Sequence, residues 1–458
     1  MDKRTYHFIG IGGIGMSGIA QILLSRGAQV SGSDVKDSQM LESLRARGAR
    51  IYIGHRAEQI GGADVVVYSS AIKEDNPEFQ EARRAGRALV KRAQVLAELM
   101  AEKNVITVAG SHGKTTTTSL VSYLLLEAGL SPTIAIGGML KNIAANASHG
   151  EGDFFVAEAD ESDGSFLFYA PTYSIITNID YEHLDYYGDF KTQLGAFKEF
   201  IHRTRHSGCV FLCSDDEHLV RIARDSPVRQ VYFGLNKGAD ITAGNIEING
   251  LSSAFDCLYG DTLVGRFELA LGGRHNISNA LSVIALALEL KIDRSLIQHV
   301  LKTYKGAGRR LDIRLQTDDL TLIDDYAHHP TEIKATLAAV RYLRAPRVVA
   351  VFQPHRYTRT KLLLKEFGNC FDDADSVIVT DIYPASEPPI EGISGRSVSE
   401  RILNAHPGKD VAYIPRAQLL EHLAAVLQPR DVVIMLGAGD ITKYTHELAQ
   451  RYSGRHTS

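Results

Sequence analysis

The sequence predicts an α/β protein of three domains, each built on a mainly parallel β-sheet. Short β-branched apolar runs alternate with segments that carry apolar residues at helical spacing along nearly the whole chain, a pattern typical of parallel sheets covered by helices. Two of the strand-to-helix turns, near residues 10 and 110, are rich in glycine. The length of 458 residues exceeds what a single hydrophobic core serves and suits about three domains.

The first domain is predicted from a strand over residues 6–9 that leads into a glycine-rich turn and a helix. The turn has the pattern GxGxxG at Gly10, Gly12 and Gly15, and Asp34 follows at the end of the next strand. This spacing predicts a Rossmann-like domain that binds a diphosphate at the helix N-terminus and a ribose at the acidic residue. NAD and a sugar nucleotide both present these groups, so the turn does not distinguish between these two ligands. Close packing of the helix on the strand is the structural alternative.

A further strand over residues 64–68 ends in the small residues Ser69, Ser70 and Ala71. Because ligands of open α/β sheets bind at the carboxyl ends of the strands, we expect these residues to line the same nucleotide site. We assign residues 1–97 to this domain.

The second domain, residues 98–309, is predicted from a phosphate-binding loop between an apolar strand and a helix. The loop consists of Gly110, Ser111, His112, Gly113, Lys114, Thr115 and Thr116. Its glycines allow the backbone to approach a polyphosphate, Lys114 is suited to the β- and γ-phosphates, and the Thr115 hydroxyl is suited to Mg²⁺. The complete pattern GxxxxGK[ST] has glycine where Val108 stands, so this is a shortened form. An ordinary strand-to-helix turn is the alternative.

Two later strands of this domain also end in polar residues. One strand, over residues 153–157, is followed by a carboxylate cluster that begins at Glu158, and another is followed by Asn178, Asp180 and His183. A phosphate-loop domain needs a carboxylate at the end of a neighbouring strand to hold Mg²⁺. We therefore predict Glu158 as a Mg²⁺ ligand and His183 as a ligand of a second metal ion. A solvated acidic turn and a structural histidine are the alternatives.

A polar segment before an apolar helix near residue 283 carries candidate base-binding residues. His275, Asn276 and Asn279 share one helix face by their spacing, which suits them to the edge of a nucleotide base, and helix capping is the equal alternative.

The third domain, residues 310–458, is predicted from further strands that alternate with helices. Arg356 and Arg359 lie three residues apart after one of these strands. Such a pair is suited to bidentate hydrogen bonds with a carboxylate, and a solvated basic turn is the alternative.

Composition restricts the class of partner. The formal net charge is −4, which argues against a general nucleic-acid or membrane-surface binder, because such proteins carry a large basic excess. Four scattered cysteines indicate buried core residues and a reducing compartment. Neither a signal peptide nor an apolar run of membrane-spanning length is recognisable. We expect a cytoplasmic protein with small-molecule ligands.

Taken together, these motifs resemble the Mur ligases of peptidoglycan synthesis. The resemblance follows the chain order over nearly its whole length and rests on residues 110–117, 158–163, 178–183, 274–279 and 324–332. Two further segments, 8–17 and 353–360, are similar to the branch that adds L-alanine to UDP-N-acetylmuramate. A related branch, which attaches a tripeptide to the same sugar nucleotide in murein recycling, shares the first segment and usually differs in the second.

The resemblance implies ATP-driven amide synthesis with Mg²⁺ or Mn²⁺. ATP would phosphorylate the lactyl carboxylate of UDP-N-acetylmuramate, and the amine of L-alanine would attack the acyl phosphate, with release of ADP and phosphate. The resemblance implies these small molecules as partners, and neither nucleic acid nor a membrane. It does not distinguish a monomer from a homodimer.

The resemblance also implies roles for residues at matching positions. The implied catalytic residues are Lys114, His112, Glu158, His183, Arg310 and His328. ATP would be bound by Gly110, Ser111, His112, Gly113, Lys114, Thr115, Thr116, His275, Asn276, Asn279, Arg310 and Asp325. The UDP-sugar would be bound by Gly12, Gly13, Ile14, Gly15, Met16, Ser17, Asp34, Ser69, Ser70, Ala71 and Asn178. L-Alanine would be bound by Tyr326, His328, Arg356 and Arg359, and metal by Thr115, Glu158 and His183. Several relatives carry a carbamylated lysine, for which Lys198 is at a plausible distance, but the alanine-adding branch typically lacks it.

Two other function classes explain only parts of the sequence. A dehydrogenase that uses NAD accounts for the first domain but leaves Lys114, Glu158 and His183 without a role. A nucleotide-gated switch that hydrolyses ATP accounts for the central domain but leaves Arg356 and Arg359 without one.

Overall fold

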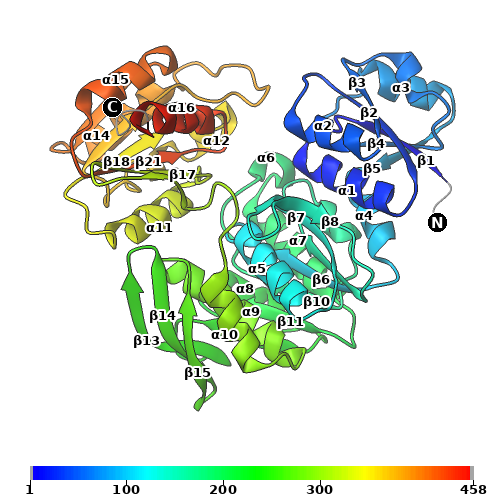
Figure 1. Ribbon diagram of the computed structural model, residues 1–458, viewed down its shortest axis with the longest axis horizontal. Helices are drawn as coiled ribbons and strands as arrows, with labels where there is room; N and C mark the ends of the chain where they lie inside the picture. The colour runs from blue at the N-terminus through cyan, green and yellow to red at the C-terminus, as the bar shows by residue number, and fades with distance from the viewer. Residues whose placement is uncertain (1–3, 454–458) are drawn as a thin grey trace. The chain divides into compact units, whose positions relative to one another are not determined.

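The structure is a computed structural model that describes residues 4–453 (Figure 1). Its strands form three sheets, of five, ten and six strands, and helices connect most of them. The predicted fold class is therefore confirmed. The chain divides into two compact units. The first contains the chain up to residue 244 together with 256–267 and 278–305, and the second contains 245–255, 268–277 and the chain from residue 306 onward.

The first sheet consists entirely of parallel strands in the order β3-β2-β1-β4-β5. The strands are β1 (Thr5–Ile9), β2 (Gln29–Asp34), β3 (Arg50–Ile53), β4 (Val65–Tyr68) and β5 (Ala88–Lys91). The helices are α1 (Ile14–Ser25), α2 (Gln39–Ala46), η1 (Ala57–Ile60), α3 (Pro77–Arg84) and α4 (Arg92–Met100). The strand order reverses beside β1, and the glycine-rich turn follows that strand, as a nucleotide-binding switch point requires.

The second sheet has the order β15-β14-β13-β12-β11-β10-β6-β9-β7-β8. Its strands are β6 (Asn104–Ala109), β7 (Thr133–Leu140), β8 (Ala145–Ser148), β9 (Phe154–Glu158), β10 (Tyr173–Ile176), β11 (Cys209–Cys213), β12 (Gln230–Gly234), β13 (Ile241–Asn249), β14 (Ser252–Tyr259) and β15 (Thr262–Leu269). Its helices are α5 (Lys114–Glu127), η2 (Ser165–Phe168), α6 (Leu184–Tyr187), α7 (Phe190–Arg203), α8 (Glu217–Ala223), α9 (Arg274–Glu289) and α10 (Arg294–Thr303). The parallel strands β9 and β10 flank β6, so the segments that follow these three strands meet at one sheet edge.

The third sheet is parallel except for its first strand, in the order β16-β17-β21-β18-β19-β20. Its strands are β16 (Asp312–Gln316), β17 (Leu320–Asp325), β18 (Val348–Phe352), β19 (Ser376–Val379), β20 (Asp410–Tyr413) and β21 (Asp431–Leu436). Its helices are α11 (Pro330–Arg341), α12 (Tyr357–Leu362), α13 (Leu364–Phe367), α14 (Gly395–Ala405), η3 (Arg416–Gln418), α15 (Leu419–Val426) and α16 (Ile441–Ser453). Alternate strand residues feed two cores, one with α11, α13 and α14 and the other with α15 and α16. The fully buried strands explain why their sequences read as continuous apolar runs.

Helix α1 packs on the second sheet within the first unit, where it contacts β7 and β8. The buried side chain of Asn146 donates a hydrogen bond of 2.9 Å to the Ile14 carbonyl. A methyl group on Gly18 would lie 3.2 Å from Cβ of Ala147. The start of the glycine-loop helix is thus tied to the sheet that carries the phosphate loop.

Several sequence predictions can be compared with this architecture. The four cysteines are buried and unpaired, as expected for core residues. None of the described helices is long and apolar enough to cross a membrane. The predicted domain limits at residues 97 and 309 stay predictions.

Candidate functional site

The phosphate loop lies between β6 and α5, and two glycines set its shape. Gly110 has φ of 128° and Gly113 has φ of 83°, a region that side chains disfavour. A methyl group on Gly110 would also collide with the Thr177 side chain and lie 2.9 Å from the Asn178 carbonyl oxygen. The backbone therefore approaches its neighbours more closely than another residue at position 110 would allow.

Lys114 is the first residue of α5, and its ammonium group lies back over the loop. Nζ donates to the carbonyl oxygens of Gly110 at 2.5 Å and Ser111 at 3.1 Å, and to Oε1 of Glu161 at 2.8 Å. Burial disfavours the charged form, but the Glu161 carboxylate outweighs that effect and raises the pKa of Lys114. The lysine therefore stays charged at the loop, where the family resemblance expects phosphate.

Thr115 and Glu158, the predicted Mg²⁺ pair, are in contact. The Thr115 hydroxyl donates to Oε1 of Glu158 at 3.1 Å, and the Gly137 N–H donates to Oε2 at 2.9 Å. Glu158 ends β9 and Thr115 lies in the first turn of α5, so adjacent strands β6 and β9 bring them together. Hydroxyl and carboxylate oxygens are the ligands that Mg²⁺ prefers.

A second group of possible metal ligands combines Glu161, Glu182 and His183, whose ligand atoms all lie within 4.8 Å of one another. Nε2 of His183 is 3.7 Å from Oε1 of Glu161 and 3.7 Å from Oε2 of Glu182. Burial raises the pKa of Glu161, and Lys114 counteracts this effect. Among residues 4–453, no hydrogen-bond donor reaches the buried Oε2 of Glu161. A buried carboxylate oxygen without a donor is costly, and a divalent cation fits this donor set.

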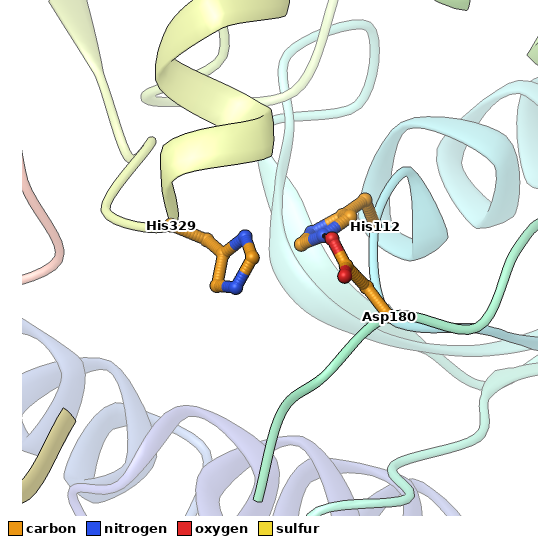
Figure 2. Close-up of side chains that lie close together, drawn as sticks. All are labelled: His112, Asp180 and His329. Carbon is orange, nitrogen blue, oxygen red and sulfur yellow. Dashed lines mark hydrogen bonds and ion pairs between the residues drawn. The ribbon is translucent and has the colours of Figure 1, made fainter. Parts of the chain in front are cut away.

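His112 is held in the loop by the segment that follows β10 (Figure 2). Nε2 of the His112 ring lies 2.9 Å from Oδ2 of Asp180. The backbone N–H of His112 donates to Oδ1 of Asn178, and the Asn178 side-chain amide donates to the backbone carbonyl of His112. Asn178, predicted to bind the UDP-sugar, therefore fixes the phosphate loop in this structure. Its contact with the sugar nucleotide stays a prediction.

The glycine-rich turn of the first sheet is organised by Asp34. Oδ2 of Asp34 accepts the Gly12 N–H at 2.9 Å, and a methyl group on Gly12 would lie at the same distance from that oxygen. Among the other predicted residues here, Met16 and Ser17 are buried in α1. The Asp34 carboxylate thus shapes the turn, and its predicted bond to a ribose remains to be tested.

The candidate base-binding residues lie on the first turns of α9, which starts at Arg274. The Asn276 side-chain amide donates to the Gly272 carbonyl at 2.8 Å, a bond that does not cap the helix because a cap accepts a backbone N–H. Burial lowers the pKa of His275 to about 4, and Arg310 adds to the shift. Within the first unit, a methyl group on Gly113 would lie 2.7 Å from Oδ1 of Asn279, so Asn279 is beside the phosphate loop.

In the second unit, Asp325 ends β17 and shapes the segment after it. Its oxygens accept the N–H groups of Leu311 at 2.6 Å and Ala327 at 2.8 Å. Burial raises the pKa of Asp325 to about 6. The Arg310 guanidinium lies 5.1 Å from the centre of the Tyr326 ring. The hydrogen bonds from Leu311 and Ala327 give Asp325 a structural role, and its predicted place near a ribose stays a prediction.

The predicted amino-acid site contains a histidine that the sequence prediction omitted. His355 stacks on Tyr383 with ring planes 9° apart, and its ring centroid is 5.7 Å from that of His328. Nη1 of Arg359 lies 3.2 Å from Nδ1 of His355. Burial lowers the pKa of His355 to about 3, with further contributions from His328 and the nearby arginines. The ring is therefore neutral near pH 7.

The two predicted carboxylate-binding arginines have different surroundings. Nε of Arg356 donates to Oε1 of Glu387 at 2.5 Å, and the Thr358 N–H and hydroxyl also donate to Glu387. Arg359 instead extends to His355. Arg356 thus already has one carboxylate partner in Glu387, and Arg359 contacts the ring of His355.

The structure adds residues that the sequence predictions did not select, namely Glu161, Glu182, His355, Tyr383 and Glu387. Glu161 and Glu182 lie in the polar segments that drew attention to Glu158 and His183, so position after a strand was the available signal. Glu387 follows no motif, and its pairing with Arg356 depends on a long loop between β19 and α14.

Family models match nearly the whole chain in three consecutive parts. Residues 5–104 match the Mur ligase family catalytic domain, residues 108–287 the Mur ligase middle domain, and residues 309–439 the glutamate ligase domain of Mur ligases.

Curated relatives and solved structures agree with these matches. Proteins named UDP-N-acetylmuramate–L-alanine ligase from Geotalea uraniireducens and Desulforapulum autotrophicum are 46% and 47% identical, covering 98% and 96% of this chain and 98% and 97% of theirs. The crystal structure of a UDP-N-acetylmuramate-alanine ligase from Thermotoga maritima superposes with a TM-score of 0.85 at 29% identity, covering 99% of this chain and 100% of that one. A murein peptide ligase from Psychrobacter arcticus shares the fold, with a TM-score of 0.72 at 22% identity over 98% of each chain.

Replacing Lys114 by alanine removes the cation that lies over the phosphate loop. We expect phosphate release from ATP to fall by about 10³-fold or more, because this charge would stabilise the transferring phosphoryl group. Lys191→Ala, at an exposed position of the same domain on α7, is the matched control and should retain activity. Substantial turnover by a folded Lys114→Ala protein would contradict the role of the loop.

The pKa of His355 predicts an effect of acid on stability. Because its folded pKa of about 3 is below the unfolded value near 6.5, the stability that depends on the neutral ring is complete above pH 6.5 and is lost as the pH falls toward 3. Between pH 7 and pH 4, the free energy of unfolding of His355→Gln should fall by about 1–2 kcal/mol less than that of the wild type. Denaturant melts at both pH values measure this, with His422→Gln on α15 as control. Equal pH dependence in wild type and His355→Gln would contradict the prediction.

Proposed function

Because this chain belongs to the Mur ligase family, we propose that it joins L-alanine to the lactyl carboxylate of UDP-N-acetylmuramate at the expense of ATP. The observation that carries this proposal is full-length similarity, near 46% identity, to curated proteins that share this one name. The reaction forms a C–N bond and supplies a precursor of peptidoglycan. We place it in the cytoplasm, where ATP and sugar nucleotides are available.

The chemistry has two steps. A carboxylate oxygen of the muramyl group first attacks the γ-phosphorus of ATP, which forms an acyl phosphate and releases ADP. The amine of alanine then attacks the acyl carbon, the amine loses a proton, and phosphate leaves with the original carboxylate oxygen. Phosphoryl transfer depends mainly on positioning and on charge stabilisation, which are what the phosphate loop offers.

Lys114 would contribute the charge for the first step. In the structure its ammonium group is held by loop carbonyls and by Glu161, so it is oriented before any phosphate arrives. His112, fixed by Asp180 and Asn178, would lie beside the muramyl carboxylate. Pre-oriented groups lower the barrier, because they need no rearrangement during the reaction.

Magnesium would occupy two places at this edge of the sheet. The residues that would hold it are Thr115 with Glu158, and His183 with Glu161 and Glu182. When bound, Mg²⁺ neutralises charge on the phosphates and on the acceptor carboxylate. The donor oxygens and the buried Oε2 of Glu161 support this assignment.

The second unit would hold the amino acid. Arg359 would bind the alanine carboxylate beside the neutral ring of His355. Nδ1 of His328 lies 3.0 Å from the Tyr326 carbonyl oxygen, a contact that requires the Nδ1–H form and leaves the lone pair of a neutral ring on Nε2. His328 is therefore suited to accept the proton of the attacking amine.

The deciding experiment measures phosphate release from ATP with Mg²⁺ and UDP-N-acetylmuramate, and compares two amines. We expect release with free L-alanine and none above background with L-Ala-γ-D-Glu-meso-diaminopimelate. Release that requires the tripeptide would overturn the alanine assignment in favour of the recycling ligase, and release without any amine would favour a plain ATPase.

Arg359→Ala tests the amino-acid site. Loss of a charged hydrogen bond to a carboxylate is worth about 1.5–3 kcal/mol, so we expect KM for alanine to rise at least about tenfold, with KM for ATP nearly unchanged. Arg341→Ala, which breaks an ion pair of the same unit on α11, is the control. An unchanged KM for alanine would remove Arg359 from the site.

A further inference from the structure

Glu387 is a carboxylate that neither the sequence predictions nor the proposed mechanism uses, and it lies beside the predicted amino-acid site of the second unit. It belongs to the long loop between β19 and α14. Its neighbours Ser386 and Pro388 are exposed, but only 12% of the Glu387 side chain is. The side chain therefore turns inward from a loop that otherwise faces solvent at this point.

The carboxylate of Glu387 binds the start of α12. Oε2 accepts the backbone N–H of Thr358 at 3.0 Å. Oε1 accepts the Thr358 hydroxyl at 2.7 Å and Nε of Arg356 at 2.5 Å. Arg356 is the N-cap residue of α12, and its own side chain makes no capping hydrogen bond. Because the first N–H groups of a helix lack partners within it and carry partial positive charge, the carboxylate caps α12 from a distant part of the chain.

Backbone contacts hold the loop between β19 and α14 against the segment that follows β18. The Tyr383 N–H donates to the Pro354 carbonyl, and the Arg356 N–H donates to the Tyr383 carbonyl, both at 2.8 Å. Ala385 and Ser386 have φ of 47° and 70°, and Arg356 has φ of 66°. Residues with a Cβ disfavour this region, and such conformations persist where the surrounding contacts fix them. The path that brings the carboxylate to α12 is therefore fixed on both sides.

The charge of Glu387 and the content of α12 connect this contact with the amino-acid site. Burial disfavours the ionised form, but the hydrogen bonds from Thr358 and then from Arg356 outweigh burial and lower the pKa of Glu387. Helix α12 also carries Arg359, whose Nη1 lies 3.2 Å from Nδ1 of His355. An anion that fixes the first turn of this short helix thus also fixes the backbone from which Arg359 extends.

We propose that Glu387 is a positioning residue for the amino acid: it holds Arg356 and the first turn of α12, and so sets where Arg359 meets the carboxylate of L-alanine. The proposal rests on the proposed function, which assigns that carboxylate to Arg359. Glu387 acts through the two arginines and does not itself bind the amino acid. Its removal should therefore impair binding of the amino acid and leave binding of ATP, at the phosphate loop of the first unit, nearly unchanged.

A carboxylate on an arginine of this site also allows the opposite role. Glu387 would then occupy Arg356 in place of the amino-acid carboxylate, and its removal would make alanine bind more tightly. The two hydrogen bonds from Thr358 favour positioning, because they hold the carboxylate at α12 independently of Arg356. The two roles predict changes of opposite sign in KM for alanine.

The test measures phosphate release from ATP with Mg²⁺ and UDP-N-acetylmuramate for full-length wild type, Glu387→Ala and Glu387→Gln. We expect Glu387→Ala to raise KM for L-alanine about tenfold or more, as for loss of a charged hydrogen bond. KM for ATP and for UDP-N-acetylmuramate, and kcat at saturating alanine, should change by less than about threefold. Glu387→Gln keeps an acceptor for the Thr358 N–H but loses the charge, so its KM for alanine should rise less.

Asp375→Ala is the matched control. Asp375 pairs with Arg341 at 2.8 Å and accepts the Val348 N–H at 2.7 Å, so its carboxylate makes the same kinds of contact in the same unit. It binds the start of β18, whereas His355 follows the end of that strand. We expect Asp375→Ala to lower the melting temperature and to leave KM for alanine unchanged.

Two results would overturn the proposal. A KM for alanine that falls in Glu387→Ala would make Glu387 a competitor of the substrate carboxylate, and an unchanged KM with a lower melting temperature would make it a purely structural residue. Wild-type release that requires the tripeptide in place of alanine would overturn the alanine assignment instead. A rise in KM for the tripeptide in Glu387→Ala would then still support positioning, and an unchanged KM would still refute it.

Discussion

The arrangement of the site depends on a largely buried positive charge in the loop that follows the central strand β6. Lys114 lies at the start of α5, and its ammonium group is surrounded by loop carbonyls and the Glu161 carboxylate. Desolvation of a lysine is costly unless a partner is close, and here the partner comes from the segment after a neighbouring strand. The order of the strands in the sheet is therefore what makes the charged loop tolerable. When phosphate binds, its oxygens can take over the role that Glu161 and the carbonyls perform in the structure.

Burial of the strands and their order in the sheets also determine which parts of the fold were predictable. Buried parallel strands must be continuously apolar, so β6, β9, β10, β17 and β18 were visible in the sequence, as were the glycines that need positive φ. The carboxyl ends of parallel strands gather at one edge, so the proximity of Thr115 and Glu158 followed from the predicted topology. The hairpin strands β13 to β15, which alternate polar and apolar residues, carried no motif and were not predicted.

The site was less predictable than the fold. Hydrogen bonds between distant segments determine which residue of a polar segment shapes a turn and which one faces a ligand. Asp34 bonds to the Gly12 backbone and Asn178 to that of His112, and both contacts depend on turn geometry that residue spacing does not encode. Arg356 is paired with Glu387, 31 positions along the chain.

In the proposed reaction, the phosphate-loop cluster activates the lactyl carboxylate through an acyl phosphate. The most direct measurement starts from UDP-N-acetylmuramate labelled with ¹⁸O in both lactyl carboxylate oxygens and follows the label by mass spectrometry after reaction with ATP and L-alanine. An acyl-phosphate intermediate predicts one ¹⁸O atom in each phosphate released and the other in the new amide. Phosphate that contains no ¹⁸O would contradict it, because the carboxylate oxygen would then never have been bonded to phosphorus.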